Sequence, residues 1–316
     1  MEYRNLGNSG LQVSVVGLGC NNFGMRMDPS ATEIVVNKAI DAGINLFDTA
    51  DVYGGAGKSE EFLGKALGAK RQDIVLATKF GMPMGKSTYT SRGSRRYIMN
   101  AVEASLRRLN TDYIDLYQMH APDATTPIDE TLRALDDLVT QGKVRYIGSS
   151  NFSGWQTAEA HYVATAAHST RFIAAQNEYS LLNRRVESEL VPAVNKYGLG
   201  ILPFFPLASG FLTGKYRQGQ AAPEGTRLGA PGPMADRIMN ERNWELLGKL
   251  EAFAESRGKG VLDVAFGWLI AQQHVGSVIA GATKPEQIDA NVAAGEWRMS
   301  AEDVAEVDGI TKETKR

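Results

Sequence analysis

Segments with the pattern of buried strands alternate with helical segments along almost the whole chain, and this alternation limits the possible folds. Apolar runs typical of strands lie near residues 14–20, 45–50, 74–80, 113–120, 144–151, 172–179, 199–206 and 277–283. Helical patterns lie near 30–42, 60–68, 94–109, 128–141, 154–167, 187–197, 241–257, 261–272, 285–294 and 300–308. Strands separated by helices form parallel sheets, and eight of them predict a closed (β/α)8 TIM barrel. An open doubly wound sheet also fits, because a strand count does not prove closure.

A short hairpin is expected before the first barrel strand. Residues 3–6 and 11–14 have strand-like character, and Gly7-Asn8-Ser9-Gly10 between them suits a turn. We expect this hairpin to plug the bottom of the barrel. Residues 28–30 and 126–127 suit helix starts, because each pairs a capping side chain with a proline. No linker or shift in composition divides the chain, so residues 1–316 are predicted to form a single domain.

Composition and charge exclude several classes of partner. The chain has 316 residues and a net charge of 34 − 36 = −2, without a run of basic residues, so we expect neither nucleic acid nor an anionic membrane to bind. Cys20 is the single cysteine, which excludes an internal disulfide and fits a reducing cytosol. The polar N-terminus does not resemble a secretion signal, and no segment has the apolar length of a membrane span. A cytoplasmic protein is expected.

Four ionisable side chains follow consecutive predicted strands. Asp48, Lys79 and His120 close apolar runs, and Tyr53 lies just beyond the first of these runs. The carboxyl ends of parallel strands meet at one face, so these groups are expected to share a site. A phenol beside an amine, a carboxylate and an imidazole suits the delivery of a proton without a metal. Taken singly, they also fit a salt bridge, a core histidine and a loop aromatic, but their joint occurrence favours catalysis.

Two connections at the same face are unusually long. Residues 81–94 follow the third strand, and residues 207–240 follow the seventh. Loops of this length are usually functional or disordered. Because barrel active sites use this face, a lid over the substrate is the favoured interpretation, and a merely mobile loop is the alternative.

Short motifs in the same order along the chain resemble the aldo-keto reductases, in particular a bacterial branch that also resembles potassium-channel β subunits. The resemblance runs from residue 6 to about residue 291. The matching pieces are Leu6-Gly7-Asn8-Ser9-Gly10-Leu11, Val16-Gly17-Leu18-Gly19, Phe47-Asp48-Thr49-Ala50 with Tyr53-Gly54, Thr78-Lys79, Tyr117-Gln118-Met119-His120, Gly148-Ser149-Ser150-Asn151-Phe152, Gln176-Asn177-Glu178-Tyr179, Pro206-Leu207-Ala208-Ser209-Gly210 with Leu212-Thr213-Gly214-Lys215, and Gly281-Ala282-Thr283.

The resemblance implies a barrel that reduces carbonyl compounds with NAD(P)H. Tyr53 then corresponds to the general acid, and its ordinary phenolic pKa of about 10 makes it a reluctant donor near neutrality. A nearby Lys79 ammonium is expected to lower that pKa, and Asp48 is expected to hold the lysine charged and oriented. His120 corresponds to the group that orients and polarises the substrate carbonyl.

The resemblance also assigns a cofactor site, whereas the Gly-x-Gly-x-x-Gly fingerprint of a Rossmann domain is absent. Ser150, Asn151 and Gln176 match positions that bind the nicotinamide carboxamide, and Phe204 matches a stacking aromatic, although these residues also suit strand caps and core. The segment expected over the pyrophosphate contributes Leu207, Ser209, Gly210, Leu212, Gly214 and Lys215. The adenosine end contributes Gly281, Thr283, Lys284, Gln287 and Asn291.

The sequence gives less specific predictions for the preferred cofactor, the substrate class and the function than for the catalytic residues. Lys284 near a helix N-terminus suits the 2′-phosphate of NADPH, although a surface lysine serving no ligand is the alternative and NADH remains possible. Phe23, Met82 and Ala121 are candidates for an apolar substrate pocket that accepts varied aldehydes and ketones. A cofactor-sensing partner subunit with little turnover is the alternative function, and the absence of a long N-terminal extension favours the enzyme. A cofactor-free barrel lyase or isomerase is a weaker third interpretation.

Overall fold

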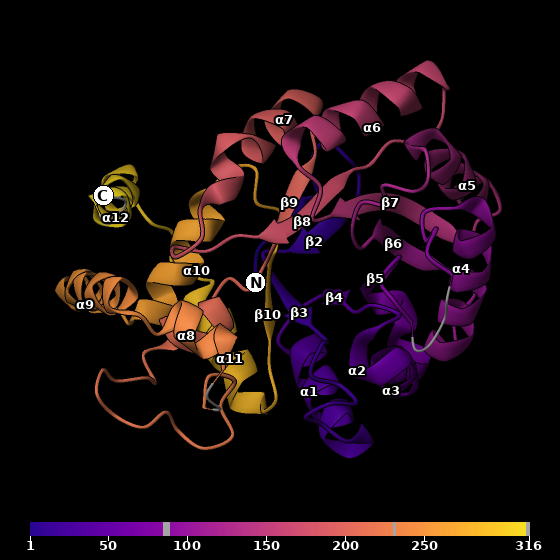
Figure 1. The fold of residues 1–316 in the computed structure, drawn as a ribbon. Helices are drawn as coiled ribbons and strands as arrows, with labels where there is room; N and C mark the ends of the chain where they lie inside the picture. The colour runs from indigo at the N-terminus through magenta and orange to yellow at the C-terminus, as the bar shows by residue number, and fades with distance from the viewer. Residues whose placement is uncertain (85–88, 230–231, 314–316) are drawn as a thin grey trace.

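The parallel strands of the barrel lie side by side in a single ring. A computed structural model describes residues 1–84, 89–229 and 232–313. Within these ranges, eight parallel strands follow the order β10-β3-β4-β5-β6-β7-β8-β9, which confirms the predicted (β/α)8 barrel (Figure 1). The strands are β3 (Val16–Gly19), β4 (Leu46–Asp48), β5 (Val75–Phe80), β6 (Ile114–Met119), β7 (Val144–Ser150), β8 (Ala174–Glu178), β9 (Gly200–Phe204) and β10 (Val278–Gly281).

The ring closes between its last two strands through a short contact. Ile201 in β9 pairs with Val275, which precedes β10. The Ile201 amide donates to the His274 carbonyl at 2.7 Å, and the Gly276 amide donates to the Ile201 carbonyl at 2.9 Å. In the described part of the chain, these two backbone hydrogen bonds are the ones that join β9 to the chain leading into β10. An open sheet is therefore excluded, and this seam is the least reinforced joint of the ring.

The interior of the barrel is apolar at its lower end and polar at its upper end. The lower layers contain Leu46, Val75, Ala77, Leu116, Ala174, Leu202 and Ile279. Leu6 and Val13 belong to the same buried cluster; they lie just after β1 (Tyr3–Asn5) and within β2 (Gln12–Ser14), which form the antiparallel hairpin. The hairpin therefore plugs the bottom, as predicted. Two residues beyond Ala77, Leu116 and Ala174, the inward positions become Lys79, Gln118 and Gln176.

The predicted helices are all present, with ends within a few residues of expectation. They are α1 (Pro29–Asp41), α3 (Lys58–Leu67), α4 (Arg95–Leu109), α5 (Ile128–Thr140), α6 (Gly154–Ala166), α7 (Leu190–Tyr197), α9 (Glu241–Ser256), α10 (Val261–Ala271), α11 (Pro285–Ala294) and α12 (Ala301–Glu313). Asp28 caps α1 by accepting from the Ala31 amide, as expected. The predicted cap at Thr126 was wrong, because its hydroxyl donates to Asp123 and Pro127 occupies the cap position of α5.

Several short helices were not predicted. They are α2 (Tyr53–Ala56), η1 (Gly68–Asp73), η2 (Arg185–Ser188), η3 (Ala208–Thr213) and α8 (Pro233–Ile238). The last two fall in the connection 207–240, which is therefore partly helical. The other long connection, 81–94, contains residues 85–88, which lie outside the described ranges, as do residues 230–231. The action of these two connections as a lid over the substrate stays a prediction.

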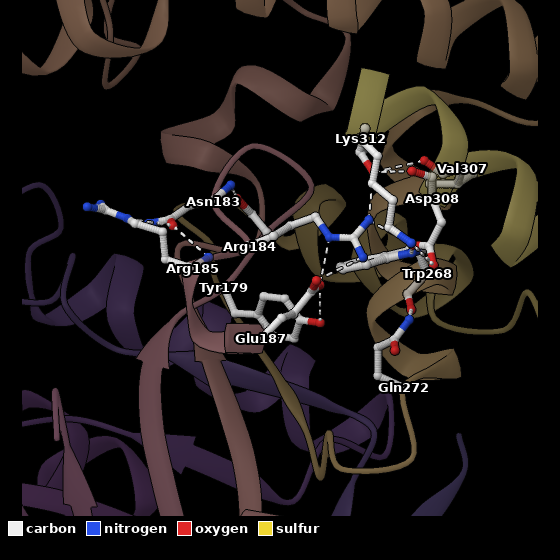
Figure 2. Close-up of polar contacts among 12 residues, drawn as sticks. Tyr179, Asn183, Arg184, Arg185, Glu187, Trp268, Gln272, Val307, Asp308 and Lys312 are labelled. Carbon is white, nitrogen blue, oxygen red and sulfur yellow. Dashed lines mark hydrogen bonds and ion pairs between the residues drawn. The ribbon is translucent and has the colours of Figure 1, made fainter. Parts of the chain in front are cut away.

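An arginine network fastens the last helix to the barrel (Figure 2). Arg184 donates to Glu187 through Nε and Nη2, and through Nη1 to Asp308 of α12 at 2.7 Å. Its guanidinium lies 4.6 Å from the ring centroid of Trp268 in α10, whose indole also donates to Asp308. Only 7% of the Arg184 side chain is exposed, so these contacts are shielded from water.

Among the described residues, none of the helices combines the length and the hydropathy that a membrane span requires.

Candidate active site

Two adjacent strands bring a carboxylate and an ammonium group together at the upper end of the barrel. Asp48 is the last residue of β4, and Lys79 lies near the end of β5. Lys79 Nζ lies 2.6 Å from Oδ2 of Asp48 and 2.9 Å from the carbonyl oxygen of Thr49. Both side chains are buried, and Lys79 is completely inaccessible. Asp48 therefore holds the Lys79 ammonium in a fixed position, away from water, beneath the mouth of the barrel.

Tyr53 and His120 lie above this pair. Lys79 Nζ is 5.2 Å from the ring centroid of Tyr53. The Tyr53 and His120 rings meet edge to face, with centroids 5.7 Å apart and planes at 82°. Gly54 has φ +71°, and a β-carbon there would lie 2.8 Å from the carbonyl oxygen of Phe23. Glycine is therefore required at this turn, which holds Tyr53 over the lysine. The structure thus brings together all four residues selected from the strand ends.

Two glutamines complete the polar layer around Asp48. Its Oδ1 accepts from Nε2 of Gln176 at 2.8 Å and from Nε2 of Gln118 at 3.2 Å. The carboxylate is thus held on both oxygens, which fixes its orientation toward Lys79. Gln176 was predicted to bind the nicotinamide carboxamide; its amide nitrogen faces Asp48, and the predicted contact stays a prediction. Gln118 was not selected from the sequence, although the alternation in β6 places it inward between Leu116 and His120.

The protonation states at the mouth follow from burial and from Lys79. Burial alone would lower the pKa of Lys79, but Asp48 and Tyr53 outweigh it, so the net shift is upward and the ammonium persists. Burial raises the pKa of Tyr53 by more than Lys79 lowers it. The expected net decrease was therefore wrong, although Lys79 does act in the predicted direction. Burial, followed by the Lys79 charge, lowers the pKa of His120 to about 3, so its imidazole is neutral.

Residues at the end of β7 support His120. Asn151 has φ +61°, a conformation that asparagine tolerates better than most residues. Its side-chain amide donates to the carbonyl oxygen of His120 at 2.9 Å and to Oγ of Ser150 at 3.1 Å. Ser150 is buried at the end of the strand. Their predicted contact with a nicotinamide stays a prediction.

The segment after β9 has an unusual backbone, and an exposed lysine, Lys215, lies against it. Phe205, Ala208, Ser209 and Gly210 all have positive φ angles. A β-carbon at Gly210 would lie 2.9 Å from Nζ of Lys215, so the ammonium rests against this glycine. The predicted pyrophosphate residues therefore share one compact loop. Within this loop, Leu212 and Ser209 are buried, whereas Leu207 and Gly214 are partly exposed. Phe204, at the end of β9, is half-buried and packs against Phe205.

The residues predicted at the adenosine end lie at the end of β10 and the start of α11. Lys284 is exposed at the N-cap of α11, and Pro285 follows in the first turn. Gln287 accepts from the Thr283 amide at 2.7 Å, so it stabilises this turn. Gly281 is exposed at the end of the strand, whereas Asn291 is buried on the helix.

An arginine from the long connection also reaches the mouth. Arg227 donates to Oδ1 of Asn22 at 3.2 Å, and its guanidinium lies 5.5 Å from the ring centroid of Phe205. Burial and the nearby Arg26 lower its pKa, while Tyr216 and Tyr53 act in the opposite direction. Arg227 therefore adds positive charge at the mouth. It was not selected from the sequence, where it lies in a Pro/Gly-rich stretch without periodicity.

The predicted substrate residues differ in accessibility. Phe23 is completely buried, whereas Met82 and Ala121 are partly exposed beside the mouth. The Met82 carbonyl oxygen accepts from the Tyr97 hydroxyl at 3.4 Å. Their contact with a substrate stays a prediction.

Known proteins resemble this chain over almost its full length. The profile of the aldo/keto reductase family matches residues 15–312. A rice protein named as a probable voltage-gated potassium channel subunit beta is 38% identical over 302 residues, covering 93% of this chain and 91% of that protein. An L-glyceraldehyde 3-phosphate reductase of Escherichia coli O157:H7 is 34% identical, covering 98% and 92%. The uncharacterized oxidoreductase YrpG of Bacillus subtilis is 38% identical, covering 96% and 93%.

The chain belongs to the aldo/keto reductase family, as the sequence motifs predicted. It is an NAD(P)H-dependent oxidoreductase of the class that reduces carbonyl compounds. The likeness to proteins named as channel β subunits is also confirmed.

Proposed function

We propose that this protein reduces aldehydes and ketones to alcohols with NADPH, and that Tyr53 donates the proton. The observation that carries the proposal is the Asp48–Lys79 pair buried beneath Tyr53 and His120. Bound NADPH supplies the hydride to the carbonyl carbon. The chain itself must supply a proton to the carbonyl oxygen and hold that oxygen in place.

The cluster suits proton delivery because each group has the required charge. Tyr53 is protonated at neutral pH, so it carries the proton to be donated. The Lys79 ammonium beside it stabilises the phenolate that forms as the proton leaves, and Asp48 holds Lys79 in position. His120 is neutral and can donate one hydrogen bond to the carbonyl oxygen without adding a second charge. Positioned proton transfer contributes roughly 10²–10⁴-fold to rate.

The charges around the mouth fit a dinucleotide phosphate. Lys215 against Gly210, together with Arg227, provides positive charge beside the loop after β9. Lys284 at the start of α11 suits a 2′-phosphate, because a helix N-terminus and an ammonium both favour a dianion. Ser150, Asn151 and Phe204 are proposed to hold the nicotinamide.

Tyr53→Phe tests the proton donor. We expect NADPH binding to persist, while reduction of 4-nitrobenzaldehyde falls by at least about 10²-fold, because the ring remains and the proton is lost. Tyr3→Phe is the matched control, since Tyr3 bonds Gly43 in the bottom hairpin region and its loss leaves the mouth intact. Undiminished turnover by Tyr53→Phe would contradict the assignment.

Lys284→Ala tests the cofactor preference. We expect the native protein to prefer NADPH and the variant to lose most of that preference, because the lysine is proposed to contact only the 2′-phosphate. Binding of NADPH and NADH is measured by fluorescence titration, with Lys312→Ala as a distant surface control. Equal use of both cofactors by the native protein contradicts the proposal.

A cofactor-sensing partner subunit is the second candidate, favoured by the 38% and 37% identity to proteins named as probable channel β subunits. The same nitrobenzaldehyde assay separates the two functions. Appreciable turnover that Tyr53→Phe removes supports the reductase. Tight NADPH binding without turnover of any aldehyde in a broad panel supports the sensor.

A further inference from the structure

A cavity lies outside the ring of strands, between α4 and the segments that follow β4 and β5. Its volume is about 360 Å³, which is in the size range of small-molecule sites. One wall is a single face of α4, where Tyr97, Ala101, Ala104 and Arg108 recur at helical spacing. In the described chain, the lining includes none of Asp48, Tyr53, Lys79 or His120. The cavity is therefore separate from the proposed active site.

The residues that line this cavity include a buried carboxyl group, Asp51, with one oxygen that has no hydrogen-bond partner among the described residues. Asp51 is only 1% exposed, whereas the α4 residues of the wall are partly exposed. Within the described residues, its Oδ1 has no hydrogen-bond partner. Arg108, a cation that also lines the cavity, is bound to Glu60 at 2.7 Å. A buried polar atom without a partner is costly, so its retention beside a cavity points to a ligand.

The carboxyl group of Asp51 is neutral near pH 7. Burial, reinforced by the Glu60 carboxylate, raises its pKa to about 8. The charged and titratable groups that face it from the surrounding elements are Glu60 of α3, Tyr97 and Arg108 of α4, Lys79 of β5 and Tyr117 of β6. Arg108 already neutralises Glu60, so neither leaves a free charge at the cavity.

The remaining charged side chain of the cavity is Arg96, which is positive and exposed to solvent. Arg96 lines the cavity and lies 5.8 Å from the ring centroid of Tyr89. It makes no ion pair with any residue in the described ranges. Ala101, Ala104 and Met84 contribute small or apolar surface to the same cavity.

We propose that this cavity binds a small hydroxylated aromatic acid. The carboxylate of the ligand pairs with Arg96, the ring lies against Ala101 and Ala104, and the hydroxyl group exchanges a hydrogen bond with Asp51. The site is independent of the carbonyl reduction proposed above, because the two share no side chain.

The experiment measures the affinity of 4-hydroxybenzoate by ligand-observed NMR and calorimetry. Benzoate lacks the hydroxyl group and 4-hydroxybenzamide lacks the charge, so each is expected to bind about three- to tenfold more weakly, as one lost polar contact implies. Arg96→Gln is expected to weaken 4-hydroxybenzoate by about tenfold. Arg95→Gln is the matched control and is expected to change nothing, because Arg95 pairs with Asp137 away from the cavity.

Two variants of Asp51 make the test specific. Asp51→Asn keeps a hydrogen-bonding group and is expected to retain binding, whereas Asp51→Leu is expected to abolish it. Affinity of the native protein should fall as the pH rises through about 8, because ionised Asp51 repels the anion; Asp51→Asn should lack that fall. Thermal unfolding checks that each variant is folded.

Three results overturn the proposal. They are the absence of saturable binding to the folded native protein at millimolar ligand, an affinity unaffected by Arg96→Gln, and simple competition between 4-hydroxybenzoate and the aldehyde substrate. The last result would place the ligand at Tyr53 instead.

Discussion

Replacing Asp48 by asparagine tests the energetics of the buried pair on which the site depends. The substitution preserves the size of the side chain and an oxygen for Gln118 and Gln176, but it removes the countercharge 2.6 Å from a completely buried ammonium. Removing one partner of a buried pair costs about 3–5 kcal/mol. The protein has one way to limit this cost, which is to release the proton from Lys79.

The free energy needed to deprotonate Lys79 sets an upper bound on the stability that Asp48→Asn can remove. An ordinary lysine has a pKa of about 10.4, so neutralising it at pH 7 costs about 4.6 kcal/mol at about 1.36 kcal/mol per pH unit. We therefore expect Asp48→Asn to lower the free energy of unfolding by about 3–4.6 kcal/mol at pH 7. If Lys79 is neutral in the folded variant, the unfolded chain binds the additional proton. The difference from the native protein then shrinks by about 1.4 kcal/mol for each pH unit up to pH 9.

Equilibrium urea unfolding at pH 7, 8 and 9 measures both quantities. Asp129→Asn is the control, because it breaks an exposed pair with Arg133 and should cost less than about 1 kcal/mol at every pH. The double variant Asp48→Asn/Lys79→Met should recover part of the loss, since neither charge is left buried. A cost below about 1 kcal/mol for Asp48→Asn, or a loss that does not change with pH, would refute the reasoning.

Two further predictions concern His120 and Arg184. Because the pKa of His120 is about 3, its imidazole should stay neutral from pH 5 to 8, and an NMR titration that detects its protonation in this range would contradict the assignment. Arg184→Met should destabilise the protein by about 2–4 kcal/mol, because it removes the buried cation that Glu187 and Asp308 share in partly buried positions. Hydrogen exchange should quicken first in α12, and unchanged protection there would argue against the fastening role.

The barrel was predictable because its signals are local and repeated. Each strand is a short apolar run, and each long helix has a periodic face or a cap such as Asp28, so errors were confined to the ends. The short helices α8, η2 and η3 were not predicted from the sequence, because each has too few turns to show a helical period. The cap expected at Thr126 failed because the hydroxyl found another acceptor, Asp123, within its own loop.

The proposed site was only partly predictable. Strand ends identified Asp48, Lys79 and His120, since parallel strands must deliver their last residues to one face. The net pKa of Tyr53 was not predictable, because it depends on how far burial offsets Lys79. Arg227 depends on the path of a long connection, and the unsatisfied Oδ1 of Asp51 depends on Arg108 pairing with Glu60. Neither has a periodic signal in the sequence.

The unequal strength of the ring has a mechanical consequence. We expect the barrel to open most easily at the seam at Ile201, which lies at the end of the barrel that the hairpin closes, since Gly200 and Gly276 face Leu6 there. The acid–base cluster lies across the ring, between β4 and β6, where strand pairing is continuous. Local opening at the seam is therefore expected to leave the distance from Lys79 to Tyr53 unchanged.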